Sequence, residues 1–66
     1  MDNIVPGKRF QFEDGNYIEV IQIKYGEMNG DNTNIVTYLI GSPKGLPRKL
    51  VMDMGQFVSN FGHLFE

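Results

Sequence analysis

YIEVIQIKY, which runs from Tyr17 to Tyr25, is the most β-prone stretch of the chain, because six of its nine residues are β-branched or aromatic. Ile18 and Val20 share one face of an extended strand, whereas Ile21 and Ile23 share the other. The buried face therefore has to change partway along, and we expect a bulge or a sharp bend near Ile21. In a small barrel, such a bend lets one strand leave one sheet and join the next.

Upstream of this stretch, the sequence predicts a shorter strand over residues 8–13. Phe10 and Phe12 would point to one face of it, with polar side chains on the other. The Asp14-Gly15 pair lies between two β-like runs, and glycine tolerates the positive φ that primed turns require. A hairpin is therefore expected between residues 8–13 and the strand that begins at Tyr17.

Downstream, residues 26–34 form the most polar stretch, and we expect a mobile loop there with Asn29-Gly30 at its tip. A third strand is predicted over residues 35–40. Glycine and proline then predict a loop over residues 41–47, followed by a fourth strand over residues 48–52.

From Asp53 onward the spacing of apolar residues becomes helical, with a stripe made of Met54, Phe57, Val58 and Phe61. Asp53 and Gln56 have the spacing of a helix N-terminal capping box. We expect Gly62 to end the helix in a left-handed conformation, which leaves residues 63–66 as a tail.

A chain of 66 residues reads as one domain, 1–66. Its predicted parts are an N-terminal arm (1–6), a barrel (7–52), a helical segment (53–62) and the tail (63–66). The predicted fold class is mainly β: a small, partly open barrel of four or five antiparallel strands with a short C-terminal helix.

Composition argues against several classes of function. The absence of cysteine excludes disulfides and thiolate metal ligands. A net charge of −2 argues against a general binder of polyanions. The single histidine, His63, has no recognisable nucleophile motif near it. We therefore predict a protein that is not an enzyme and that has no catalytic, metal or cofactor-binding residues.

The location of the protein is predicted from the same composition. The longest uncharged run, residues 32–43, is too short and too polar to span a bilayer. Residues 1–6 lack the basic and apolar regions of a signal peptide. Together with the absence of cysteine, these features lead us to expect a cytoplasmic protein.

One segment combines positive charge with more apolar side chains than the peripheral positions of a small domain usually carry. Three of the six cations fall within residues 44–49, and further apolar residues follow. The predicted partner-binding residues are Lys44, Leu46, Arg48, Lys49, Met52, Leu64 and Phe65. Completion of the core is an equally good interpretation for Leu46, Met52, Leu64 and Phe65.

A second function is compatible with the same cations. Small β-barrels bind nucleic acid with a cationic rim and exposed aromatic rings. The basic 44–49 segment would supply the rim, helped by Lys8-Arg9, and Tyr17, Tyr25 or Tyr38 would stack on bases. A lysine- and arginine-rich edge is also a device that prevents two sheets from pairing. Homo-oligomers are a third possibility, because the predicted core is thin.

The order of several short motifs resembles that of a known group of proteins. The motifs are PGKRF from Pro6, DGNYIEVIQI from Asp14, IVTY from Ile35 and MGQFV from Met54. This order resembles small uncharacterised phage and bacterial proteins with an SH3-like barrel. The resemblance implies an SH3-like fold and an accessory protein of a bacteriophage that binds and modulates a host or viral protein, in the host cytoplasm if phage-encoded. It implies no catalytic or ligand-binding residues.

Overall fold

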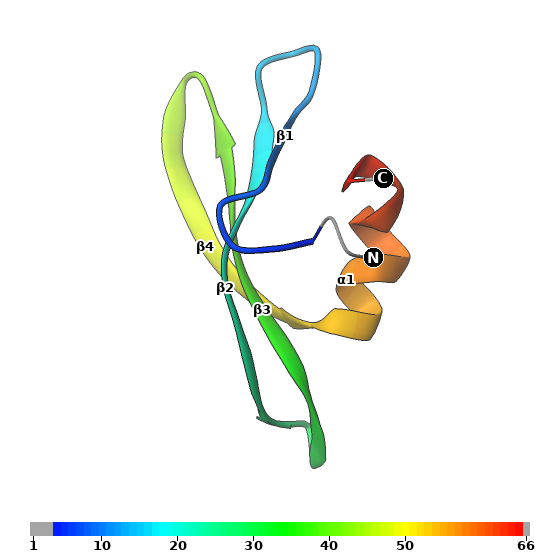
Figure 1. Cartoon of the computed structure of the whole chain (residues 1–66). Coiled ribbons are helices and arrows are strands. Elements are labelled where there is room, and N and C mark those ends of the chain that lie inside the picture. Colours follow the sequence, from blue (N-terminus) through cyan, green and yellow to red (C-terminus); the bar gives the residue numbers. More distant parts are fainter. Residues whose placement is uncertain (1–3, 66) are drawn as a thin grey trace.

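The computed structural model describes residues 4–65 and shows four antiparallel strands in one open sheet, followed by a helical C-terminus (Figure 1). The elements are β1 (Arg9–Gln11), β2 (Tyr17–Met28), β3 (Asp31–Ser42), β4 (Gly45–Asp53), the helix α1 (Met54–Phe61) and the 3₁₀ helix η1 (Gly62–Phe65). The strand order is β1-β2-β3-β4, so β1 and β4 lie at opposite edges. The mainly β prediction is confirmed, whereas an SH3-like barrel is not.

The predicted bulge in β2 is present. The pairing between β2 and β3 moves from Val20↔Tyr38 to Gln22↔Thr37, which leaves Ile21 without a partner in β3. This extra residue reverses the alternation, so Val20 and Ile23 both pack in the core although three positions separate them.

The β2–β3 hairpin differs from the expected mobile loop over residues 26–34. Asn29 and Gly30 have φ angles of 56° and 87°, as a two-residue primed turn requires. The tip was predicted correctly. The two strands remain paired as far as Met28 and Asp31, so the loop prediction was wrong. The twist of a primed two-residue turn matches that of the flanking strands. The strands can therefore stay paired up to the turn itself.

The predicted loop over residues 41–47 is also largely strand. Only Pro43 and Lys44 form the turn, and β4 begins at Gly45. The register shifts again between Ile40↔Arg48 and Ser42↔Gly45, which places an extra residue in β4 near Pro47. Proline is tolerated at a bulge in an edge strand, and this explains why a proline-containing segment can continue the sheet.

The C-terminus begins as expected and ends differently. Asp53 is the N-cap of α1, and its Oδ1 accepts a hydrogen bond from the Gln56 backbone N–H at 2.8 Å. The backbone of Gly62 has the right-handed helical conformation, with φ −56°, and the chain continues into η1. The predictions of a left-handed cap at Gly62 and of a tail over residues 63–65 were therefore wrong, because Phe65 turns back into the core. Glu66, the last residue of the predicted tail, lies outside the described residues.

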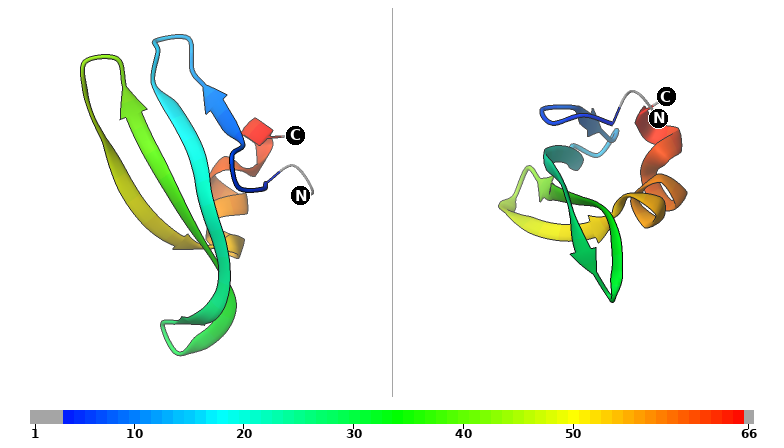
Figure 2. Two further views of the ribbon diagram at one scale, coloured as in Figure 1. Left: turned by 60° about the vertical axis from the view of Figure 1, so that its left-hand side comes forward. Right: turned by 60° about the horizontal axis from the view of Figure 1, so that its bottom comes forward.

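The helices cover one face of the sheet, and the core lies between them (Figure 2). The buried side chains of the core are Ile4, Ile18, Val20, Val36, Tyr38, Phe57 and Phe65. The N-terminal segment lies on the same side, so Ile4 of the predicted arm belongs to the core. Residues 1–3 of that arm lie outside the described residues. Within residues 4–65, no helix has the length and apolar character needed to cross a membrane.

Gly41 is a position where the fold requires glycine. It is buried opposite Tyr17, whose ring occupies the space that a Cβ would need. We expect Gly41→Ala to push that ring aside and to lower the free energy of unfolding by about 1–3 kcal/mol, as measured by urea denaturation. Gly45→Ala is the control, because its nearest obstacle is the Ser42 Oγ at 3.4 Å. Unchanged stability of Gly41→Ala would contradict this packing.

Candidate interaction surface

Four of the predicted partner-binding residues lie together on the β3–β4 hairpin. Lys44 is in its turn, and Leu46, Arg48 and Lys49 follow in β4. All four are exposed, and Leu46 has 92% of its surface accessible to solvent. We call this group, Lys44, Leu46, Arg48 and Lys49, the hairpin surface.

The hairpin surface carries positive charge that the described part of the chain does not neutralise. Within residues 4–65, one pair of oppositely charged side chains lies within 4 Å. It joins Arg9 and Glu19, with 3.8 Å between Arg9 Nη1 and Glu19 Oε1. Lys44, Arg48 and Lys49 have no such carboxylate partner among these residues. Their charges are free to attract an external anion.

The other three predicted residues are separated from the hairpin surface. Met52 packs against the core, and its sulfur accepts a hydrogen bond from Asn60 Nδ2 at 3.9 Å. Leu64 is partly buried against the same core, and Phe65 is 4% exposed. These three residues therefore complete the core, which was the other interpretation of their sequence positions.

β4 also presents an open backbone edge, which the cations of residues 44–49 predicted only as an edge protected from pairing. Within residues 4–65 it is the last strand of the sheet and pairs with β3 on one side only. Figure 2 shows α1 and η1 over one face of the sheet, with α1 beginning where β4 ends. Pro47 followed by two cations was the available signal, since proline and charge are typical of edge strands.

The tyrosines proposed for base stacking are not gathered near the cations. Tyr38 is buried, and desolvation raises the pKa of its hydroxyl. The ring of Tyr17 is already covered by the Arg9 guanidinium, 3.9 Å from its centroid. Tyr25 is 68% exposed but pairs with Asn34, near the opposite hairpin. The sheet therefore offers no aromatic platform beside residues 44–49.

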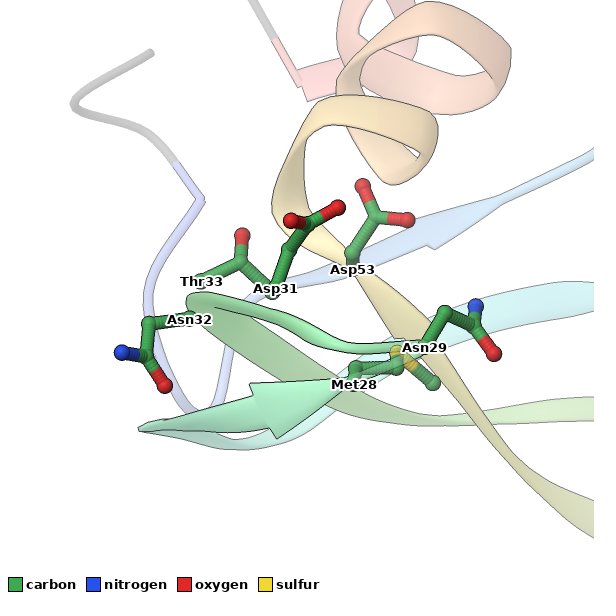
Figure 3. A pocket seen from close by; sticks show the side chains of 6 residues that line it. All are labelled: Met28, Asn29, Asp31, Asn32, Thr33 and Asp53. Atoms are coloured by element: carbon green, nitrogen blue, oxygen red, sulfur yellow. The ribbon is translucent and has the colours of Figure 1, made fainter.

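A shallow pocket of about 310 Å³ lies at the β2–β3 end of the sheet (Figure 3). It is lined by Met28, Asn29, Asp31, Asn32, Thr33 and Asp53. Its two carboxylates come from Asp31 and Asp53, and Asp53 already caps α1. Across residues 4–65 there is no group of three or more histidine, cysteine, aspartate or glutamate side chains placed to hold a metal ion.

Comparisons with known proteins give no assignment. No protein-family model matches the chain, and neither a curated protein nor a solved structure matches it. The function is therefore inferred from the hairpin surface and the open edge of β4.

Proposed function

We propose that the protein is a non-enzymatic binding module that acts on another protein through the hairpin surface. The observation that carries this proposal is the exposure of Leu46, at 92%, on a hairpin that also carries three cations without a carboxylate partner in the described chain. Burying a leucine side chain in a complex contributes about 2 kcal/mol. A partner with an apolar contact and acidic residues would use both properties of the surface.

A protein partner is favoured over the alternative, a small β-barrel nucleic-acid-binding protein that uses the basic 44–49 segment. Three cations give only a small gain from counterion release. The chain has a net charge of −2, and its tyrosines lie in the core, beneath Arg9 or near the other hairpin. Stacking of bases beside the cations is therefore not supported.

The biological setting is part of the same proposal. The motif order that resembles phage and bacterial SH3-like proteins suggests an accessory protein that modulates a host or viral protein in the cytoplasm. An SH3-like relationship is compatible with a bulge in β2 and a C-terminal helical segment. An experimental structure in which β1 and β4 close around the core would support that relationship.

The proposal is tested by affinity capture from bacterial lysate, followed by reconstitution with the purified captured protein. Capture is run with and without nuclease and at two salt concentrations. A stoichiometric protein that survives nuclease treatment and binds again in purified form supports the proposal. Capture that disappears with nuclease would replace it with the nucleic-acid alternative.

Reversal of two charges tests whether the hairpin surface makes the contact. We expect Arg48→Glu with Lys49→Glu to weaken the reconstituted complex at least about tenfold, because two attractions become repulsions. The melting temperature should change little, since both side chains are exposed. Binding is measured by calorimetry and unfolding by circular dichroism.

The matched control is Lys8→Glu with Lys24→Glu, which makes the same change in net charge at two exposed lysines outside the hairpin surface. This control should retain the affinity of the unmodified protein. Equal weakening by both double variants would mean that only net charge matters, and an intact complex with Arg48→Glu and Lys49→Glu would reject the hairpin surface as the site.

A further inference from the structure

We infer that β4 is the docking edge for an extended acidic segment of the partner, which adds to the sheet as a fifth strand. The inference rests on the proposed function and specifies the chemistry of the partner. Its basis is the coincidence, on one strand, of an unpaired backbone edge and two cations that have no carboxylate partner within residues 4–65.

The alternation of the ladder identifies the free backbone groups of β4. In an antiparallel sheet, successive residues of a central strand bond alternately to its two neighbours. The tight turn at Asn29-Gly30 makes Asp31 a residue that bonds to β2, so the odd-numbered residues of β3 face β2 and the even-numbered ones face β4. The partners of those even-numbered residues in β4 are Arg48, Leu50 and Met52.

This assignment has an independent check. Val20, the partner of Tyr38, donates to the Lys8 carbonyl at 2.8 Å and accepts from the Gly7 N–H at 2.8 Å, so its backbone faces away from β3. An even-numbered residue of β3 is thus not bonded to β2, as the alternation requires. The N–H and C=O groups of Lys49 and Val51 therefore point to the open edge.

The usable edge is short and has defined ends. Pro47 has no N–H, and Asp53 is already the N-cap of α1. Residues 48–52 lie between them and span about 17 Å of strand. A segment of about five residues would fill this edge, which matches the way extended peptides add to sheets, with main-chain hydrogen bonds for affinity and alternate side chains for specificity.

The side chains of β4 specify what such a segment carries. Arg48 and Lys49 are neighbours in a strand, so they project to opposite faces of the sheet. Two adjacent carboxylates in the partner, one on each face, would meet them. Val51 shares the face of Lys49 and is 52% exposed, so an apolar or β-branched residue is expected opposite it.

A second copy of this chain is a poorer occupant of the same edge. It would bring a second Arg48 and a second Lys49 to an edge of about five residues, and like charges at this distance repel. The carboxylate nearest to that edge in β4, that of Asp53, is engaged with the Gln56 N–H. An acidic partner segment removes the repulsion that a second copy would add.

The first experiment uses synthetic six-residue peptides with blocked ends. The acidic probe is acetyl-TVTEET-amide, which places two glutamates opposite Lys49 and Arg48 when it lies antiparallel to β4. The control peptide has two lysines in place of the glutamates. We expect the acidic probe to bind at least about tenfold more tightly, which is a difference that calorimetry or an NMR titration resolves.

Amide hydrogen exchange shows where the probe binds. In the free protein, the Lys49 and Val51 amides should exchange rapidly, whereas that of Leu50 should be protected by β3. The acidic probe should slow exchange at Lys49 and Val51 by about tenfold and leave Leu50 unchanged. Protection elsewhere, or equal binding of both peptides, would overturn the inference. Self-association of the free protein through the same amides would also overturn it.

A backbone variant separates this inference from the proposed function. Val51→Pro removes a free N–H without removing a bond to β3, and Val51→Thr is the matched control. Loss of probe binding at least about tenfold in Val51→Pro alone is expected. If Val51→Pro does not fold, total synthesis of the 66-residue chain with an ester bond in place of the Val51 amide removes the same donor.

The two proposals then fail in different ways. If the reconstituted protein complex is lost on reversal of Arg48 and Lys49 but kept in Val51→Pro, the hairpin surface binds its partner without strand addition, and only the inference fails. If the complex survives all of these changes, both proposals fail. If it is lost in Val51→Pro and kept in Val51→Thr, strand addition is supported.

Discussion

Phe57→Ala is expected to lower the free energy of unfolding by about 3–5 kcal/mol. The Phe57 side chain is 0% exposed, and its ring contacts those of Tyr38 and Phe61, with centroids 5.2 Å away in each case. Removing a buried phenylalanine ring costs about 3–5 kcal/mol. A domain of this length has a free energy of unfolding on the order of 3–10 kcal/mol, so this loss removes between about a third and all of it.

Urea denaturation followed by circular dichroism measures the effect of Phe57→Ala. Phe12→Ala is the matched control, because Phe12 is 37% exposed and lies outside the sheet core. Its loss should lower the free energy of unfolding by about 1 kcal/mol, mainly through its edge-on contact with Phe10. Equal effects of the two substitutions would mean that α1 does not pack on the sheet as described.

Phe65→Ala is expected to destabilise the fold almost as strongly, by about 3 kcal/mol or more. Phe65 is 4% exposed and lies between the rings of Phe57 and Phe10, at centroid distances of 6.0 and 6.4 Å. It connects the C-terminus to β1, so its removal should expose both. Thermal unfolding of Phe65→Ala beside His63→Ala, an exposed neighbour, checks this expectation.

The same comparison decides between two interpretations of the C-terminus. If Phe65 belonged to a partner-binding tail, Phe65→Ala would weaken the complex and leave the isolated protein as stable as before. The packed position in η1 requires the opposite result, in which stability falls before binding is considered. An unchanged melting temperature would therefore reject the packing of η1.

Local sequence signals predicted the parts of the fold that depend on neighbouring residues. The reversal of apolar alternation in β2 predicted the bulge, Asn29-Gly30 predicted the turn, and Asp53 with Gln56 predicted the start of α1. Each of these features is determined by a few adjacent side chains or by backbone conformation. Such determinants are visible without knowledge of the rest of the chain.

The incorrect predictions depend on contacts between distant residues. Residues 26–34 are polar, and their extension of the hairpin depends on cross-strand pairing that composition does not report. Phe65 enters the core because α1 and η1 bring it next to Phe10, more than fifty positions earlier in the sequence. For the same reason, the predicted site is divided in the structure. The residues of the hairpin surface lie on one hairpin, whereas Met52, Leu64 and Phe65 pack in or against the core.

The bulge in β2 also determines where the length of the chain can vary. Ile21 has no partner in β3, so its deletion would leave Val20 opposite Tyr38 and Gln22 opposite Thr37, with Ile23 still facing the core. Deletion of a paired residue away from the bulge, such as Lys24, would instead turn Gln22 toward the core and Ile23 away from it, because the side-chain period is two. The strand thus contains one position at which a codon can be lost while every cross-strand pair is kept. Variation in length among descendants of this sequence should therefore concentrate there.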